Sequence, residues 1–208
     1  MSIPDYMAHC DDVLQGVYDI PLNFTKRVPV IVDIGANVGA FALWASKRWE
    51  GCALICYEPV TENYKHILDL RDQNPNIIAF NTGVRSAAGQ GVMFRGENNC
   101  GECSVHQDLD ETTGEQIEAR FIDAKDIPYG HILKIDTEGC EVEILSRLIQ
   151  VDRGNEFLAI LVEWHRESDR LIIDGLLSEH YQMCGAVCNI PERGVAKYVL
   201  KSMVKRIK

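Results

Sequence analysis

The strongest constraint on the fold is an alternation of short, β-branched apolar segments with amphipathic stretches. Segment 28–34 is a β-branched apolar run followed by a glycine turn, and segments 53–57 and 77–80 repeat the strand pattern. Segments 131–135 and 157–162 do the same, and each precedes a stretch with apolar residues at helical spacing. This alternation predicts an α/β fold with a doubly wound, mostly parallel, Rossmann-like sheet and helices on both faces.

Three segments lie outside the alternation. Residues 1–27 predict an N-terminal helical extension. Residues 85–116 are rich in glycine, cysteine and acidic residues, and they predict an irregular insertion with short strands that acts as a lid or as a surface loop. Residues 182–200 predict two strands around a turn, and hence an antiparallel hairpin at the C-terminal edge of the sheet. Without a linker or an internal repeat, residues 1–208 predict a single domain.

The charge is divided unevenly along the chain. The formal net charge is −10, but residues 197–208 carry five basic and no acidic residues, so the preceding part carries −15. An acidic body repels phosphate backbones, so no nucleic-acid partner is expected, and the basic tail is interpreted as a solvated C-terminus.

Hydropathy excludes a membrane protein with spanning helices. The longest apolar run, 38–45, is eight residues, whereas a membrane-spanning helix needs about 20. Because no basic region precedes an apolar stretch, we expect no signal peptide and a cytoplasmic protein. The sequence leaves the oligomeric state open.

Eight cysteines raise the question of a metal site. In the absence of a signal peptide, unpaired thiols are favoured over disulfides. Cys100, Cys103 and His106 have close spacing, and Cys184 with Cys188 could complete a zinc site. The two groups are about 80 residues apart and the second spacing is loose, so unrelated thiols are the favoured interpretation and no metal is expected.

The carboxyl end of the first predicted strand carries a glycine turn, Asp33-Ile-Gly35-Ala-Asn37-Val-Gly39. Gly35 permits a tight turn close to a ligand, and Gly39 permits close packing of helix on strand. Glu58 ends the second strand, 23 residues after Gly35, where a carboxylate accepts hydrogen bonds from ribose hydroxyls in nucleotide-binding sheets. The combination predicts a cofactor that contains adenosine.

The nature of the turn favours a cationic cofactor. In the dinucleotide fingerprint G-x-G-x-x-G the middle glycine admits the pyrophosphate, but here Asn37 takes that position and Asp33 adds a negative charge. A P-loop sequence is also missing. S-adenosylmethionine, with its sulfonium and ammonium charges, therefore fits better than a nicotinamide dinucleotide or a nucleoside triphosphate.

Two segments carry a resemblance to a known family. Val32-Asp-Ile-Gly-Ala-Asn-Val-Gly39 and Leu133-Lys-Ile-Asp-Thr-Glu-Gly-Cys-Glu141 together resemble the FkbM-type S-adenosylmethionine-dependent methyltransferases, which are class I methyltransferases. Segments 57–60, 81–84 and 163–165 match further motifs of that family, so the resemblance covers about residues 28–166. It implies methylation of a hydroxyl on a small molecule or glycan. The cysteine-rich stretch 98–106 departs from the family, which leaves the substrate class open.

The roles of individual residues follow from their places at strand ends. We expect Asp33 to face the methionine ammonium, Glu58 to bind the ribose, and Asn81 together with Gly83 to Arg85 to meet the adenine. The complete expected cofactor-binding set is Asp33, Gly35, Ala36, Asn37, Gly39, Glu58, Pro59, Asn81, Gly83, Val84 and Asp136.

Methylation of a hydroxyl also needs a base within hydrogen-bond reach. Asp136 ends the fourth parallel strand and His165 follows the fifth, so either one is a candidate base, and Glu138 is a candidate for orienting the substrate. Lys134, inside a buried strand, predicts an ion pair with Glu163 or Asp136. Glu141 is interpreted mainly as a complement to a helix dipole, and Trp164 as a possible cavity residue.

Other functions remain as alternatives. N-methylation of an amine or a protein would not need a strong base. A non-catalytic domain that binds S-adenosylmethionine is a different class of function, and the acidic residues at the strand ends argue against it.

Overall fold

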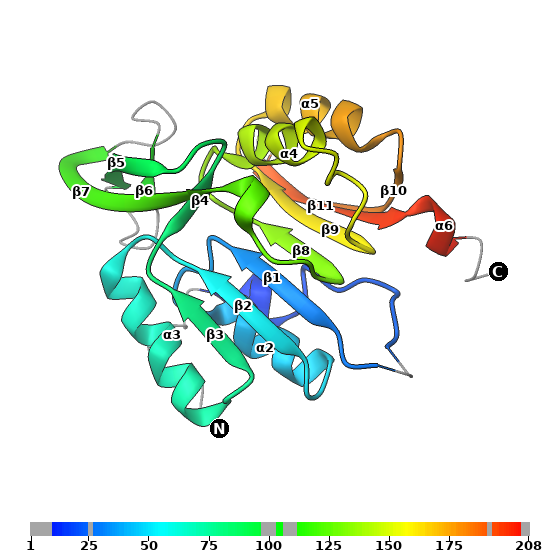
Figure 1. The fold of residues 1–208 in the computed structure, drawn as a ribbon, viewed down its shortest axis with the longest axis horizontal. Helices are drawn as coiled ribbons and strands as arrows, with labels where there is room; N and C mark the ends of the chain where they lie inside the picture. Colours follow the sequence, from blue (N-terminus) through cyan, green and yellow to red (C-terminus); the bar gives the residue numbers. More distant parts are fainter. Residues whose placement is uncertain (1–9, 25–26, 97–102, 106–111, 191–192, 205–208) are drawn as a thin grey trace.

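A computed structural model describes residues 10–24, 27–96, 103–105, 112–190 and 193–204 (Figure 1). Seven of the described strands form one sheet in the order β10-β11-β9-β8-β1-β2-β3. They are β1 (Val30–Ile34), β2 (Ala53–Tyr57), β3 (Ile77–Phe80), β8 (Ile132–Ile135), β9 (Ala159–Trp164), β10 (Tyr181–Ile190) and β11 (Arg193–Leu200). Within this sheet β9, β8, β1, β2 and β3 are parallel to one another, whereas β11 runs antiparallel to both β9 and β10. The predicted fold class and its antiparallel edge hairpin are confirmed.

Helices cover both faces of this sheet (Figure 1). The helices among the described residues are α1 (Asp11–Leu14), α2 (Ala40–Arg48), α3 (Thr61–Gln73), α4 (Glu141–Gln150), α5 (Glu167–Leu177) and α6 (Lys201–Val204). Because side chains alternate along a strand, Ile31 packs with α2 and α3 on one face, and Val32 packs with α4 and α5 on the other. The two hydrophobic cores therefore lie on opposite sides of one sheet.

The strand order places the site. The order reverses at β1, which pairs with β2 on one side and with β8 on the other. In open α/β sheets, ligands bind outside the carboxyl ends of the strands at such a reversal. The carboxyl ends of β1 and β8, at Ile34 and Ile135, are therefore the expected centre of the site.

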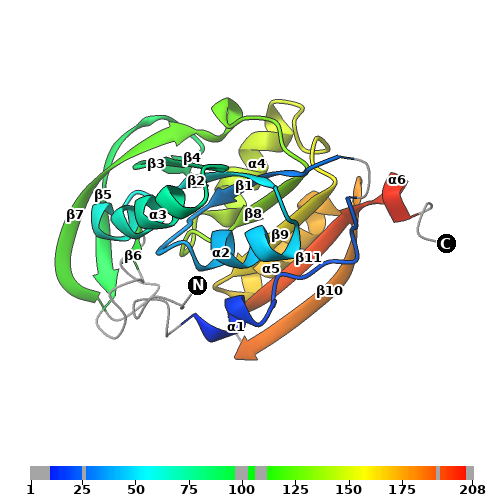
Figure 2. The ribbon, with the colours of Figure 1, turned by 90° about the horizontal axis from the view of Figure 1, so that it is seen from below.

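A second sheet lies beyond these strand ends at one end of the molecule (Figure 1, Figure 2). Its order is β4-β7-β5-β6, and its strands are β4 (Gly83–Arg85), β5 (Gly89–Gly96), β6 (Cys103–Ser104) and β7 (Thr112–Asp123). A 3₁₀ turn, η2 (Ala124–Asp126), leads from β7 back toward β8. The sequence predicted an irregular insertion with short strands over 85–116, and the described residues of this segment lie mostly in the strands of this second sheet.

Two glycines of the second sheet, Gly83 and Gly91, pack against Phe121. From the sequence alone, the glycines of this region predicted irregular structure. A Cβ on Gly83 would lie 2.6 Å from the ring of Phe121, and one on Gly91 would lie 3.1 Å from the same ring. These glycines let β4 and β5 close over Phe121.

Three segments differ in detail from their prediction. Of the predicted N-terminal helical extension, the described residues show the short helix α1, and residues 1–9 lie outside the described part. Lys197 lies in β11 and donates a hydrogen bond to the carbonyl of Val17, so part of the predicted tail is folded. Helical spacing in the sequence predicts that Ile172, Leu176 and Leu177 face inward, but the buried residues of α5 are Ile173 and Leu177, and Ile172 is 47% exposed. No helix formed by the described residues is both long enough and apolar enough to cross a membrane.

Candidate active site

The loop after β1 is shaped by left-handed residues. Gly35 has φ 75°, Asn37 φ 50° and Gly39 φ 87°. A Cβ on Gly35 would lie 1.6 Å from the carbonyl oxygen of Asp136, so only glycine fits there. The backbone N–H groups of Gly35 and Ala36 both donate to the carbonyl of Tyr57, each at 3.0 Å. The loop is thus fixed against the ends of β8 and β2.

Glu58, at the end of β2, is buried and stabilises the same loop. Its carboxylate accepts hydrogen bonds from the backbone N–H groups of Asn37 and Val60, both at 2.8 Å. Burial raises the pKa of Glu58 to about 7, although these two hydrogen bonds oppose the shift. In this arrangement the carboxylate holds the loop that lines the cavity described below.

The raised pKa of Glu58 has a consequence for stability. The folded chain holds this proton more tightly than the unfolded chain, so stability is lost as the pH rises from 4.5 to about 7. We expect the difference in unfolding free energy between wild type and Glu58→Gln to change by about 2–3 kcal/mol between pH 5 and pH 8, with the wild type losing stability. Urea unfolding at both pH values measures it. The control is Glu62→Gln, which changes an exposed carboxylate. If the free energy of unfolding of Glu58→Gln changed with pH as that of the wild type does, the raised pKa of Glu58 would be contradicted.

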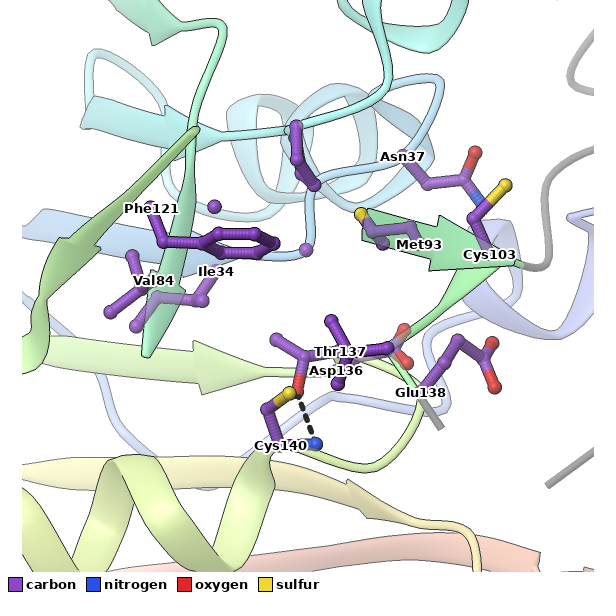
Figure 3. A pocket seen from close by; sticks show the side chains of 14 residues that line it. Ile34, Asn37, Val84, Met93, Cys103, Phe121, Asp136, Thr137, Glu138 and Cys140 are labelled. Carbon is purple, nitrogen blue, oxygen red and sulfur yellow. Dashed lines mark hydrogen bonds between the residues drawn. The ribbon is translucent and has the colours of Figure 1, made fainter. Parts of the chain in front are cut away.

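A cavity opens where the two sheets meet (Figure 3). The space at this opening, counted together with the solvent that it admits, is about 540 Å³. Its lining comes from the ends of the main strands and from the second sheet, and consists of Ile34, Gly35, Asn37, Pro59, Gly83, Val84, Met93, Cys103, Val105, Phe121, Asp136, Thr137, Glu138 and Cys140. Figure 3 shows Phe121, Ile34 and Val84 together at one side, and Asp136, Thr137 and Glu138 at another. The cavity therefore has an apolar part and a carboxylate part.

The predicted site residues divide into two groups. Those that line the cavity are Gly35, Asn37, Pro59, Gly83, Val84, Asp136 and Glu138. Those outside its lining are Asp33, Ala36, Gly39, Glu58, Asn81 and His165. The Asn81 amide donates to the carbonyls of Glu58 and Pro59, so its side chain fixes the turn after β2. Arg85 forms an ion pair with Glu143 at 2.7 Å.

Asp33 is fully buried beneath the turn. Its carboxylate lies 3.3 Å from the Nζ of Lys134, which also lies 3.3 Å from Asp136 and donates a hydrogen bond to the carbonyl of Gly35 at 2.6 Å. Burial raises the pKa of Asp33 more than Lys134 lowers it. Burial also opposes the charge of Lys134, but Asp136 and Asp33 outweigh it and raise the pKa of the amine. The predicted ion pair of Lys134 with Asp136 is present, and Lys134 pairs with Asp33 as well.

His165 lies at the centre of a group of carboxylates. Its Nε2 is 2.9 Å from Glu138, 3.9 Å from Asp136 and 4.0 Å from Glu163, and its Nδ1 is 3.4 Å from Glu141. Burial favours the neutral ring, but Glu138 and Glu141 outweigh burial and raise the pKa of His165 well above its usual range. The structure thus brings together the three candidate catalytic residues, Asp136, His165 and Glu138.

Glu141 has a larger structural role than a helix dipole would give it. Its carboxylate accepts hydrogen bonds from the backbone N–H groups of Thr137 and Gly139 and from the Thr137 hydroxyl. Burial raises the pKa of Glu141, but contact with His165 and these hydrogen bonds lower it to about 2. Glu141 therefore ties the loop after β8 to His165.

Some residues of the site were missed by sequence reasoning. Met93, Cys103 and Phe121 line the cavity from the second sheet, which no strand-end signal indicated. The hydroxyl of the buried Tyr18 donates to Glu163 at 3.0 Å and reaches Asp136 at 3.4 Å. Trp164, a possible cavity residue from the sequence, packs instead beneath Gly194 in the hairpin, where a Cβ would lie 2.5 Å from its ring.

The cysteine cluster is described only in part. Cys100 and His106 lie outside the described residues. Cys103 is buried in the cavity wall, where burial raises the pKa of its thiol to about 11, whereas Cys184 is exposed on β10. The interpretation of these residues as unrelated thiols stays a prediction.

Two proteins of similar sequence are methyltransferases. No family model matches the chain. The chain is 25% identical to the methyltransferase sdnD of Sordaria araneosa, over 86% of this chain and 68% of that protein. It is 23% identical to the hexuronic acid methyltransferase AglP of Haloferax volcanii, over 79% of this chain and 68% of that protein. Both relatives support a methyltransferase.

Among solved structures, the methyltransferase FkbM of Methylobacillus flagellatus superposes with a TM-score of 0.61 at 16% identity. The predicted resemblance to FkbM-type methyltransferases is confirmed. The match covers 86% of this chain but 45% of that one, so this chain spans about half the length of the FkbM protein. At this identity the superposition shows a common fold.

Proposed function

We propose that this FkbM-like chain transfers a methyl group from S-adenosylmethionine to a hydroxyl of a small molecule or glycan. The observation that carries the proposal is the cavity at the carboxyl ends of β1 and β8, which places an apolar wall beside the carboxylates of Asp136 and Glu138. An apolar wall suits a purine ring, and carboxylates suit a cation. Both features of S-adenosylmethionine therefore find a matching surface in one cavity.

The residues at hand fit this cofactor. The backbone from Gly35 to Asn37 and the side chains of Pro59 and Val84 would hold it, with Phe121 against the purine. The Glu58 carboxylate is adjacent to the loop and would bind the ribose. When bound, S-adenosylmethionine supplies an electrophilic methyl group on a sulfonium.

The chain's own residues prepare the acceptor. Asp136 lines the cavity and is the group placed to take the hydroxyl proton, whereas both ring nitrogens of His165 face carboxylates and the ring lies outside the lining. The Nζ of Lys134 lies 3.3 Å from the Asp136 carboxylate and helps to hold it in position. Glu138, whose Oε2 lies 2.9 Å from the Nε2 of His165, would orient the acceptor hydroxyl. Holding the reactants in line is the main contribution of a protein to such a displacement.

The name of AglP supports a glycan acceptor, since it is a hexuronic acid methyltransferase. The test is an assay of S-adenosylhomocysteine formation with three acceptor sets: uronic acids and their glycosides, hydroxylated natural products, and amines. Turnover with a hydroxyl acceptor supports the proposal. Turnover with amines alone would favour the N-methyltransferase alternative, and tight cofactor binding with no turnover in any set would favour a non-catalytic domain.

Cofactor binding can be tested separately with a pair of glycine variants. A Cβ on Gly83 would press on Phe121 and lie 3.5 Å from Pro59, both in the cavity wall, whereas a Cβ on Gly89 meets nothing within 4 Å. We expect Gly83→Ala to weaken S-adenosylmethionine binding about tenfold, because it displaces a wall of the cavity, a cost of about 1.4 kcal/mol. Gly89→Ala should leave the affinity unchanged. Calorimetric titration measures both, and equal affinities would exclude the cavity as the cofactor site.

A further inference from the structure

The carboxylate part of the cavity contains a set of possible metal ligands. We propose that Asp136, Glu138 and His165 form a binding site for a divalent transition-metal ion. Each residue offers one ligand atom, and the three atoms lie within 4.8 Å of one another. Asp136 and Glu138 follow β8, and His165 follows β9, the strand that pairs with β8.

The separations match the size of a metal coordination sphere. Two adjacent ligands of an octahedral ion with bonds of about 2.1 Å are about 3.0 Å apart, and two opposite ligands are about 4.2 Å apart. The Nε2 of His165 lies 2.9 Å from Glu138 Oε2 and 3.9 Å from Asp136 Oδ1. An ion therefore fits among the three atoms with small adjustments.

A second observation points to a missing ligand. The His165 side chain is 1% exposed, yet neither of its ring nitrogens makes an aligned hydrogen bond with any described residue, and the same holds for Glu138 Oε2. His165 Nε2 and Glu138 Oε2 are 2.9 Å apart, but an N–H bond on the ring would not point at the carboxylate oxygen. A cation between them would satisfy the lone pairs of both atoms.

The surroundings of His165 have the form usual for a metal ligand. The second ring nitrogen of a metal-binding histidine generally faces a carboxylate that fixes its tautomer and orientation. Here Nδ1 lies 3.4 Å from Glu141, which the backbone N–H groups of Thr137 and Gly139 hold in place. Nε2 is then the nitrogen that faces Asp136 and Glu138.

The donor set indicates the class of metal. An imidazole with two carboxylates suits Mn²⁺, Fe²⁺ or Zn²⁺ better than Mg²⁺, which prefers oxygen ligands. Three protein ligands leave positions open, and Asp136 and Glu138 line the cavity, so the open positions face an acceptor. The role of the ion rests on the proposed function: it would orient the acceptor hydroxyl and lower its pKa.

The test is a titration of the purified, metal-stripped full chain with MnCl₂, followed by the loss of the electron paramagnetic resonance signal of free Mn²⁺. We expect one equivalent to bind. Glu138→Gln and His165→Gln should each weaken binding at least tenfold. The matched control is Glu167→Gln. Glu167 follows His165 by two residues, and its exposed carboxylate pairs with Arg170. This variant should leave Mn²⁺ binding unchanged.

Circular dichroism and thermal unfolding confirm that each variant is folded. Failure of the wild type to bind at about 1 mM Mn²⁺, or an equal loss in all three variants, overturns the site. Because this titration contains neither cofactor nor acceptor, its result is independent of the proposed function. Mn²⁺ binding without any methyl transfer would support the site and overturn the function, and methyl transfer without Mn²⁺ binding would do the reverse.

Discussion

Replacement of Lys134 by methionine is expected to lower the free energy of unfolding by about 3–5 kcal/mol, because it leaves a buried carboxylate without its partner. Lys134 is 3% exposed and Asp33 is 0% exposed, so water cannot replace the ammonium group. The variant also loses the hydrogen bond from Nζ to the carbonyl of Gly35. Urea unfolding monitored by circular dichroism measures the change.

Two controls separate the charge from the packing. In the double variant Asp33→Asn/Lys134→Met the unpaired charge is gone, so we expect it to be more stable than Lys134→Met alone. The single variant should also lose more stability at pH 8 than at pH 5, because Asp33 can take up a proton at the lower pH. A loss below about 1 kcal/mol in Lys134→Met at pH 8 would show that the ion pair does not hold this part of the sheet.

Asp136→Asn is expected to lower kcat for methyl transfer by about 10³-fold, within the range found when a general base is removed. The change is isosteric and Asp136 lies at the partly exposed cavity wall, so the fold should persist. The measurement is the rate of S-adenosylhomocysteine formation at saturating S-adenosylmethionine, with binding of the cofactor measured in parallel.

The matched comparison is His165→Gln under the same conditions. In the proposed function His165 would act on the acceptor only through Glu138, 2.9 Å away, and it does not line the cavity, so we expect a smaller loss of kcat than for Asp136→Asn. The opposite order would identify His165 as the base. A loss below about tenfold in both variants would mean that no base is needed, as expected for an amine acceptor.

Much of the main sheet could be predicted because its signals are local. Segments such as 53–57 and 77–80 coincide with β2 and β3, since short β-branched runs between glycine or proline residues have few other ways to be buried. The face of α5 was displaced by one position, from Ile172 to Ile173, because a run of apolar residues at 171–173 offers two equally good helical faces.

Site residues that follow the end of a strand could be predicted from the sequence. Residues whose position depends on neighbouring side chains could be predicted less well. Asp136 and Glu138 line the cavity as a strand-end position suggests. Asp33, also at a strand end, is fully buried against Lys134 beneath the turn and does not line the cavity. This position depends on the partner side chain on β8, which a strand-end signal does not reveal. The second sheet was missed because its glycines serve packing on Phe121, a contact between distant segments.

The cavity is built by two separate parts of the chain. The polar groups that would act on an acceptor stand on the main sheet, whereas Met93, Cys103 and Phe121 reach the cavity from a sheet that the chain forms between β3 and β8. Substitutions in β5 to β7 would therefore change the size and shape of the cavity while Asp136 and Glu138 keep their places on the main sheet.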